Sequence, residues 1–382
     1  MIAELKKALS VSKHPGMSQK LSLPRLVWQA LPFIFSPGGY ARPPLTVYWS
    51  VNSVCNLRCK MCDVGNPNPD SNFFANLRLD GKFTEIPIER FKSVIDEVAP
   101  YEPTISITST EPLLYKPLGE AIAYARHRGL DVAVTTGGYI LPKRAEELVE
   151  AGLTRLNVSI DGPSDLHNQI RGRSDSFQRS TEGITIFKEL ARQKGQNVEV
   201  LVNFTITNMN YHSLEAYYLA LADFPIDRLN FTYMSYVTEE MAKTHNQIWG
   251  HKYNATVNCL NEDTQPDRVD VIKLSEQIRA IQAKGDRRVA FLPAFGLEEL
   301  KTYFYKPTHF MGQQRCMVNW FIAEIIASGE VVPYTRCYYI PFGNIHNQSF
   351  LEIWNGEKMR AWRRDLRKYK RFPACTRCDQ CY

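Results

Sequence analysis

The chain has 382 residues, of which 44% are hydrophobic and 23% are charged, and its formal net charge is +6. These values are those of an ordinary globular protein with room for one barrel and a smaller module, and the mild charge does not indicate a nucleic-acid partner. The nine cysteines fall into two clusters with ligand-like spacing plus Cys259, which excludes a secreted disulfide scaffold and predicts a cytoplasmic protein with metal sites.

The first segment is a lead-in, residues 1–44, which ends in a loop rich in proline and glycine. Its first twenty residues are polar and dotted with lysine, so no signal peptide is predicted. The apolar run 26–35, LVWQALPFIF, is too short to span a bilayer and contains Pro32. Two interpretations stay open: a segment that packs on the rest of the protein, or an interfacial anchor that gives weak, peripheral association with a membrane.

Strand-like and helix-like segments alternate from residue 46 onward. The predicted strands are 46–52, 104–108, 131–135, 155–160, 198–207 and 228–234. The predicted helices are 87–98, 116–128, 142–151, 177–193 and 211–222, and a loop rich in Asn, Pro and Asp covers 66–81. This alternation is typical of parallel βαβ units, so the predicted fold class is α/β. Residues 239–307 form a less regular, partly helical bridge.

Three cysteines lie within eight residues directly after the first strand: Cys55, Cys59 and Cys62, in CNLRCKMC. Thiolates are soft ligands that suit iron–sulfur clusters and zinc. Three of them hold three corners of a cubane cluster and leave the fourth iron open, whereas a structural zinc site needs a fourth protein ligand. The nearest candidates, His127 and His167, are far downstream. An open-iron cluster is therefore favoured over zinc, and three cysteines this close cannot all form disulfides.

This Cys-x3-Cys-x2-Cys spacing resembles the signature of the radical S-adenosylmethionine (SAM) superfamily. The resemblance implies a partial (β/α)6 barrel, similar to a TIM barrel, with functional residues at the C-terminal ends of its strands. It also implies a [4Fe–4S] cluster that binds SAM and cleaves it to a 5′-deoxyadenosyl radical, which takes hydrogen from the substrate. An external electron donor of the flavodoxin or ferredoxin type is the implied partner. Met61 stands where the family often packs an aromatic residue near the adenine.

Five further residues are candidates for contacts with SAM. Glu111, in Ser-Thr-Glu-Pro after the second strand, is similar to the family's glutamate that binds the SAM amino group. Arg171 resembles the arginine that pairs with the SAM carboxylate, because a guanidinium suits a carboxylate bidentately. Ser159 and Asp161, at the end of the fourth strand, stand where the family makes polar contacts to SAM. Asn203, in the fifth strand, either points at SAM or is a structural amide.

A second group of cysteines lies beyond residue 310 and ends in Cys-x2-Cys-x2-Cys. Its members are Cys316, Cys337, Cys375, Cys378 and Cys381. With the flanking Gly-Asn-Ile-His and Phe-Leu-Glu-Ile-Trp-Asn, the group resembles the SPASM and twitch modules of radical SAM enzymes. The resemblance implies one auxiliary [4Fe–4S] cluster, with Cys378 or Cys381 left over as a spare thiolate. A zinc knuckle is the alternative, because Cys-x2-Cys also suits zinc.

The predicted domains are the lead-in, 1–44, the radical SAM barrel with its bridge, 45–305, and the auxiliary-cluster module, 306–382. The resemblance implies a radical SAM oxidoreductase. Its expected substrate is a small molecule (a sugar, nucleoside, polyol or lipid head group), because the lead-in is shorter than the recognition domain of many peptide maturases. A peptide-modifying maturase or epimerase and a non-catalytic iron–sulfur redox protein are the alternatives.

Overall fold

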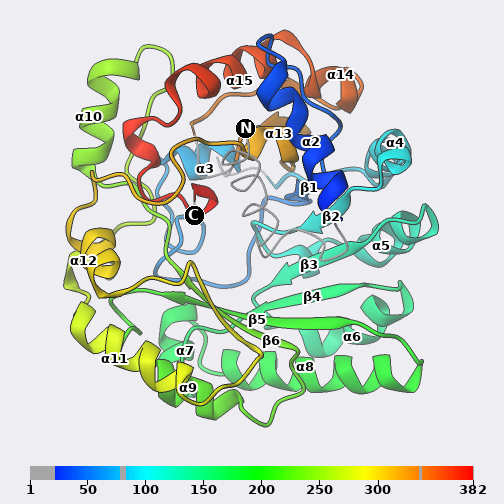
Figure 1. Cartoon of the computed structure of the whole chain (residues 1–382). Coiled ribbons are helices and arrows are strands. Elements are labelled where there is room, and N and C mark those ends of the chain that lie inside the picture. The colour runs from blue at the N-terminus through cyan, green and yellow to red at the C-terminus, as the bar shows by residue number, and fades with distance from the viewer. Residues whose placement is uncertain (1–21, 78–82, 335–337, 382) are drawn as a thin grey trace.

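One ten-stranded sheet lies at the centre of the computed structural model, which describes residues 22–77, 83–334 and 338–381 (Figure 1). The strand order is β10-β9-β8-β1-β2-β3-β4-β5-β6-β7. All pairings from β8 through β1 to β7 are parallel, and β9 and β10 add an antiparallel edge. The bounds are β1 Thr46–Trp49, β2 Thr104–Ile107, β3 Val132–Thr136, β4 Arg155–Ser159, β5 Glu199–Ile206, β6 Arg228–Tyr233, β7 Val289–Leu292, β8 Ile322–Ile325, β9 Glu330–Val332 and β10 Gly343–Asn344.

Helices connect the parallel strands along the outside of the sheet, and α2, α14 and α15 lie before the first strand or after the last one in the chain (Figure 1). Their bounds are α2 Leu23–Phe35, α3 Asn72–Asn76, α4 Ile88–Val98, α5 Leu118–His127, α6 Leu141–Glu150, α7 Ser164–Arg171, α8 Ser176–Gln193, α9 Leu214–Leu221, α10 Glu239–Trp249, α11 Val271–Gln282, α12 Leu297–Tyr305, α13 Val318–Phe321, α14 Phe350–Trp354 and α15 Glu357–Tyr369. The predicted α/β class is confirmed. The barrel is a partial one, because the strand order of the described residues begins at β10 and ends at β7.

Two strands extend the parallel sheet beyond the six that the sequence predicts. β7 belongs to the bridge and pairs with β6, and β8 belongs to the C-terminal segment and pairs with β1. Each has four residues, which is too short for a period to stand out in the sequence. The short helix α3, inside the predicted loop 66–81, and the helix α7 are not predicted either.

The strands bury apolar side chains on their outer face and carry polar side chains on their inner face. Phe204 of β5 packs on Tyr217 of α9 with ring centroids 4.6 Å apart, so the neighbouring Asn203 points to the opposite, inner face. Strand register places further polar residues on this inner face: Thr135, Asn157, Ser159 and Asn230. The interior of the barrel is therefore polar around β3 to β6.

The apolar run 26–35 packs on the protein along one face of α2, where Leu26, Ala30 and Phe33 are buried. Gln29 is buried as well. Its amide nitrogen, Nε2, donates hydrogen bonds of 2.9 Å to the carbonyls of Pro43 and Trp320. The interpretation as a packed segment is thus borne out for this face. In the described part of the chain no helix combines the length and the apolar character that crossing a bilayer requires.

Arg377 is fully buried and connects the C-terminal segment, residues 373–381, to α12 through hydrogen bonds. Its Nε donates to the carbonyl of Tyr303 at 2.7 Å, and its Nη2 donates to the carbonyls of Thr302 and Lys306 at 2.7 and 2.5 Å. Its Nη1 donates to the carbonyl of His309 at 2.9 Å. The C-terminal carbonyls of a helix attract cations, and this arginine adds charged donors to carbonyls of Thr302 and Tyr303 that also accept from the N–H of Lys306 and the hydroxyl of Tyr236. It thereby positions the cysteines on either side of it.

We expect the substitution Arg377→Met to lower the free energy of unfolding by about 3 kcal/mol, because several hydrogen bonds to a charged group are lost and each contributes about 1.5–3 kcal/mol. Hydrogen exchange of the amides in residues 375–381 should accelerate. The matched control is Arg192→Met, whose side chain is 75% exposed and whose removal should change stability by less than about 0.5 kcal/mol. Unchanged exchange in the Arg377 variant would contradict this role.

Candidate functional site

The cysteine loop lies at the C-terminal end of β1 and contacts the end of α7. Cys55, Cys59 and Cys62 are free thiols, of which Cys59 is buried. The backbone N–H of Arg58 donates to the carbonyl of Arg171 at 3.1 Å, and that of Lys60 donates to the carbonyl of Ile170 at 3.0 Å. The loop therefore satisfies two carbonyls that the C-terminus of α7 leaves without partners.

Two glycines permit the close approach of this loop to its neighbours. A Cβ on Gly65 would stand 2.3 Å from the backbone nitrogen of Cys59. Gly172 has a φ of +69°, and a Cβ there would stand 2.9 Å from the carbonyl oxygen of Arg58. Both contacts are with backbone atoms, which cannot move aside as a flexible side chain does. The loop conformation thus depends on glycine at these positions.

We expect Gly65→Ala to destabilise the protein by about 1–3 kcal/mol, the usual cost of overpacking, and to lower the iron retained after desalting. The control is Gly296→Ala, because a Cβ at Gly296 has its nearest neighbour at 3.6 Å, an ordinary contact. Thermal unfolding and iron content measure both effects. Equal behaviour of the two variants would show that the loop tolerates a side chain at Gly65.

The chemistry of the three thiols fits an iron–sulfur cluster. Burial, the carboxylate of Glu111 and the thiols of Cys59 and Cys62 together raise the pKa of Cys55 to about 12. Burial also raises the pKa of Cys59, to about 11. The three sulfurs are thus electrostatic neighbours. Among the residues that the structure describes, no three His, Cys, Asp or Glu side chains surround one point as ligands of a single ion do. The thiolates of a cubane each bind a different iron and therefore stand farther apart.

Arg171 and Asp161 form a buried ion pair beside Cys59. The Nε of Arg171 donates to Oδ2 of Asp161 at 2.7 Å, and Nη2 forms an ion pair with the same oxygen. Nη1 points at the sulfur of Cys59, 3.5 Å away. The other carboxylate oxygen of Asp161 accepts the backbone N–H of Thr205 at 2.8 Å. The pair therefore links the cysteine loop to β4, β5 and α7.

Glu111 follows β2 and is 1% exposed. Its Oε1 accepts hydrogen bonds from the hydroxyl of Thr136 at 2.7 Å and from the backbone N–H of Leu113 at 3.0 Å, and its Oε2 accepts the N–H of Gly137 at 2.9 Å. Burial raises the pKa of this carboxyl, and the three hydrogen bonds oppose that rise. The carboxylate is therefore held rigidly between the ends of β2 and β3.

The remaining predicted contacts of SAM lie on the inner face or in the loop. Met61 is buried. Asn203 accepts a 3.0 Å hydrogen bond from Nδ2 of Asn230, its register partner on β6. Ser159 is its register partner on β4 and is half-buried. The structure thus brings the cysteine loop, Glu111 and Arg171 together, and it places Asn203 and Ser159 along the barrel interior.

Two residues support the predicted site residues through contacts that the sequence does not predict. His167 is buried, accepts the backbone N–H of Asp161 through Nδ1 at 3.1 Å, and lies 3.0 Å from the hydroxyl of Ser176 through Nε2. Burial lowers its pKa well below the usual value, so the ring is neutral and supports Asp161. Thr136 supports Glu111 in the same way. The four-residue spacing of His167 and Arg171 is a sequence signal, since it places both on one face of a helix.

The C-terminal cysteines lie next to the end of β6. The backbone N–H of Asp379 donates to the hydroxyl of Ser235 at 3.0 Å. A cavity of about 40 Å³ here is lined by Ser235, Cys375 and Cys378, among others. The sulfur of Cys375 lies 3.5 Å from the hydroxyl of Tyr338. Cys337 and the side chain of Cys381 lie outside the described residues.

Cys316 approaches this group through the backbone of residues 370 and 371. Its N–H donates to the carbonyl of Lys370 at 3.1 Å. Arg371, which follows Lys370 in the chain, donates from Nη2 to the carbonyl of Cys375 at 3.4 Å. Cys316 and Cys375, two of the five predicted auxiliary ligands, are therefore linked through residues 370 and 371.

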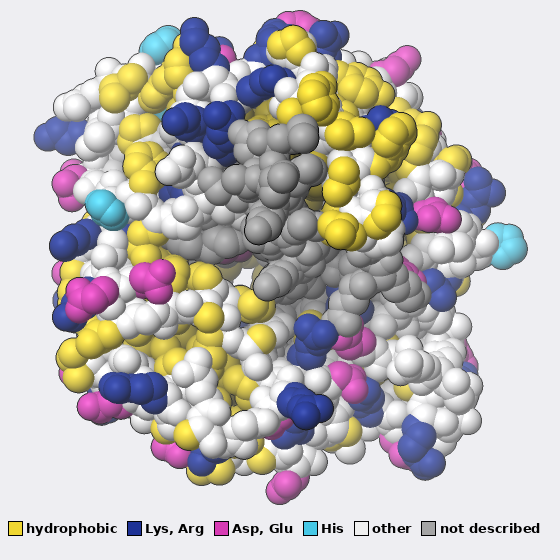
Figure 2. Space-filling view, in the orientation of Figure 1, with side chains coloured by type: hydrophobic (Ala, Val, Ile, Leu, Met, Phe, Trp, Pro, Cys, Tyr) yellow, Lys and Arg dark blue, Asp and Glu magenta, His cyan; other side chains and the backbone are white. Residues whose placement is uncertain are grey.

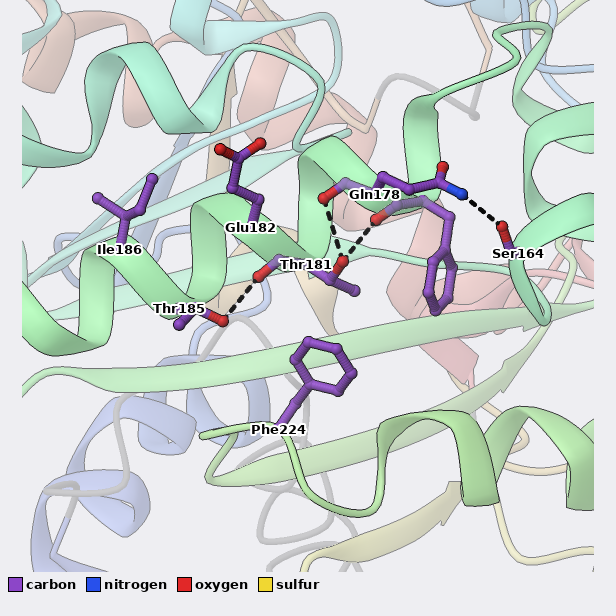
Figure 3. A pocket seen from close by; sticks show the side chains of 8 residues that line it. Ser164, Gln178, Thr181, Glu182, Thr185, Ile186 and Phe224 are labelled. Atoms are coloured by element: carbon purple, nitrogen blue, oxygen red, sulfur yellow. Dashed lines mark hydrogen bonds between the residues drawn. The ribbon is translucent and has the colours of Figure 1, made fainter.

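A larger hollow of about 520 Å³ lies on the outside of α8, where Phe177, Ile186 and Phe224 line it (Figure 3). The hydroxyls of Thr181 and Thr185 in its wall already donate to carbonyls of the preceding helical turn. None of the predicted site residues lines this hollow. It has few polar groups left for a ligand, so we place the functional site at the cysteine loop.

Two family models match this chain, one over the first cysteine loop and the barrel and one over the C-terminal cysteines. The Radical SAM superfamily model matches residues 49–221, and the model of the SPASM iron-sulfur cluster-binding domain matches residues 316–382. Together the two matches cover well over half of the chain.

Curated relatives are similar over different lengths. A Fe-coproporphyrin III synthase of Methanosarcina barkeri is 28% identical over 222 residues, which are 57% of this chain and 51% of the relative. The chain thus spans about half the length of that relative. An AdoMet-dependent heme synthase of the same organism is 25% identical over 329 residues, or 84% of this chain and 85% of the relative.

A solved structure shares the fold. SuiB of Streptococcus suis bound to S-adenosylmethionine superposes with a TM-score of 0.60 at 16% identity, over 95% of this chain and 77% of SuiB. This identity is too low to carry more than the fold.

Proposed function

Since the chain belongs to the radical SAM superfamily and ends in an iron–sulfur cluster-binding domain, we propose that it is an oxidoreductase that uses SAM to oxidise a polar small molecule. The bound [4Fe–4S] cluster and SAM supply the electron and the species that takes hydrogen from the substrate. The residues of the chain bind these groups, orient them and exclude water.

In this proposal Cys55, Cys59 and Cys62 hold three irons of the cluster and leave the fourth to SAM. Arg171 serves two roles. Three of the five N–H groups of a guanidinium point at Asp161 and at the sulfur of Cys59, and the other two remain for the SAM carboxylate. A positive charge beside the Cys59 sulfur also stabilises its thiolate form.

Glu111 receives the SAM ammonium group. The support for this role is that the carboxylate is buried, rigid and close to Cys55, whose pKa it raises. We further propose that Met61, Ser159 and Asp161 line the SAM site, as the resemblance to the family implies.

The polar side chains on the inner face of the barrel are the observation that supports a polar substrate. Asn157 is buried, its Nδ2 donates to the hydroxyl of Thr135 at 3.1 Å, and its Oδ1 has no partner among the described residues. Asn203 and Asn230 continue this row of amides. Buried amides need partners, and the hydroxyl groups of a sugar, nucleoside, polyol or lipid head group provide them. An apolar substrate would leave them unsatisfied.

Cys316, Cys337 and Cys375, with Cys378 or Cys381, hold the auxiliary cluster in this proposal. That cluster supplies an acceptor for the second electron of the oxidation, at a potential set by its ligands and burial. An external donor of the flavodoxin or ferredoxin type supplies the first electron. One SAM is consumed for each product.

The test measures 5′-deoxyadenosine released by the reduced enzyme in the presence of cell extract. We expect stimulation by the small-molecule fraction that survives protease and is lost after periodate, which cleaves vicinal diols. Stimulation that protease abolishes would indicate a peptide maturase. The absence of 5′-deoxyadenosine from an enzyme with intact clusters would indicate a non-catalytic redox protein. In deuterated water, a product two hydrogens lighter supports oxidation, whereas an inverted carbon that carries one deuterium indicates an epimerase.

Glu111→Gln gives a specific test of the SAM site. The substitution keeps the shape of the side chain but removes its charge, so the charge-assisted contact with the SAM ammonium is lost. We expect SAM affinity to fall by about 1.5–3 kcal/mol, as measured by equilibrium dialysis with the reconstituted protein. Glu182→Gln, on the outer surface of α8, is the control. Unchanged affinity in the Glu111 variant would refute its role.

A further inference from the structure

The helix α2 has only two polar side chains, Gln29, which is buried, and Arg25, which is paired with Glu102. Besides the apolar side chains that it buries, it carries a second apolar stripe formed by Pro24, Trp28, Leu31 and Phe35, at the spacing of one helical face. Trp28 is 56% exposed and Phe35 is 66% exposed. Hydrophobic side chains gather over this part of the surface in Figure 2. A helix that is apolar all round is normally buried on all sides, so this exposed stripe needs an explanation.

The contacts of the inner face fix the direction of the outer stripe. Phe33 packs edge-to-face on Trp320, with ring centroids 4.9 Å apart. Gln29 is held by hydrogen bonds to the carbonyls of Pro43 and Trp320. The helix therefore cannot rotate to bury Trp28 and Phe35 without breaking buried hydrogen bonds and aromatic packing.

Three arginines lie beside α2 and the residues that follow it. The guanidinium of Arg42 stacks 3.4 Å from the centre of the Trp28 ring. Arg367 and Arg360, both on α15, donate to the carbonyls of Ile34 and Gly38 at 2.7 and 3.0 Å, which brings α15 alongside the end of α2 (Figure 1).

The segment 357–371, which contains α15, concentrates the positive charge of the chain. It has eight Lys and Arg residues and two acidic residues, so its formal net charge equals the +6 of the whole chain. Lys358, Lys368 and Lys370 are exposed. An exposed apolar stripe next to a segment with excess positive charge is the pattern of a protein surface that binds anionic lipid.

We propose that the outer stripe of α2 and the cations of segment 357–371 form a docking surface for a membrane that contains anionic phospholipid. Trp28 and Phe35 enter the interfacial layer, and the basic residues contact the phosphate groups. A second copy of the chain fits less well, because a two-fold interface would bring the cations of the two copies together. This surface is separate from the cysteine loop and does not depend on the proposed reaction.

The test is sedimentation of the full chain with vesicles of phosphatidylcholine alone or mixed with phosphatidylglycerol. We expect binding to the mixed vesicles, at least tenfold weaker binding to the neutral ones, and loss of binding at high salt. The double variant Trp28→Ser/Phe35→Ser should bind the mixed vesicles at least tenfold more weakly. The control is Leu219→Ser/Ile248→Ser, whose parent side chains are exposed to a similar degree, 58% and 57%, on α9 and α10, and it should bind like the parent.

A charge variant tests the second component. Lys368→Glu/Lys370→Glu should weaken binding to the mixed vesicles while it leaves circular dichroism unchanged. Equal binding of the parent and the Trp28/Phe35 variant would overturn the proposal. So would a concentration-dependent dimer, seen by sedimentation velocity without lipid, that the Trp28/Phe35 variant abolishes, because the stripe would then be a contact between copies. Binding of an acidic flavodoxin in place of vesicles, lost in the same variant, would overturn it as well.

Discussion

Replacement of Cys55, Cys59 and Cys62 together by alanine should remove about four irons per chain, the content of one cubane cluster, and abolish cleavage of SAM. The three thiols lie in one loop, and Cys59 and Cys62 are close enough to Cys55 to raise its pKa. The auxiliary cluster should remain, because its proposed ligands approach the barrel from the C-terminal tail. Iron analysis and electron paramagnetic resonance of the reduced protein measure the two clusters separately.

Cys259→Ala is the control for this experiment. Cys259 is buried like Cys59, but it belongs to neither cysteine cluster, and its backbone N–H donates to Asp63 at 2.9 Å, a contact that alanine keeps. We therefore expect a normal iron content and normal SAM cleavage in this variant. Cleavage of SAM that persists in the triple variant would refute the assignment of the cluster to these cysteines.

Asp161→Ala should be the most destabilising single substitution in the site. It leaves the guanidinium of Arg171, which is 9% exposed, without its counter-ion. Removal of one partner of a buried pair costs about 3–5 kcal/mol, whereas replacement of both partners by apolar residues is often neutral. The double variant Asp161→Leu/Arg171→Met should therefore recover much of the lost free energy of unfolding.

The same pair of variants separates stability from function. The double variant should remain weak in SAM affinity, because the guanidinium that faces Cys59 and the proposed SAM carboxylate is gone. Chemical denaturation and equilibrium dialysis measure the two properties. If the double variant is no more stable than Asp161→Ala, the two residues do not interact as the structure indicates. If it binds SAM like the parent, the proposed role of Arg171 is wrong.

The order of the elements and the first cluster loop follow from the sequence by itself. Six of the strands repeat with helices at regular intervals, and this local periodicity is sufficient to predict a parallel α/β sheet. The cysteine spacing is local as well, so the open-iron cluster and the SAM family could be predicted without tertiary contacts. The motif Ser-Thr-Glu-Pro predicts Glu111 as a site residue. Its position beside Cys55 depends on strand adjacency, which the alternation of elements implies.

Only the tertiary structure decided which distant residues meet. β8 joins β1 across more than 270 positions of the chain, and no local pattern specifies such a pairing. Arg171 was predicted as a partner of SAM, but its pairing with Asp161 and its contact with Cys59 depend on the way α7 folds back under the cysteine loop. The exposed stripe of α2 could not be predicted from the sequence for the same reason. The sequence gives the helix apolar residues on two opposite faces, and which of them is buried depends on the position of Trp320, almost three hundred residues away.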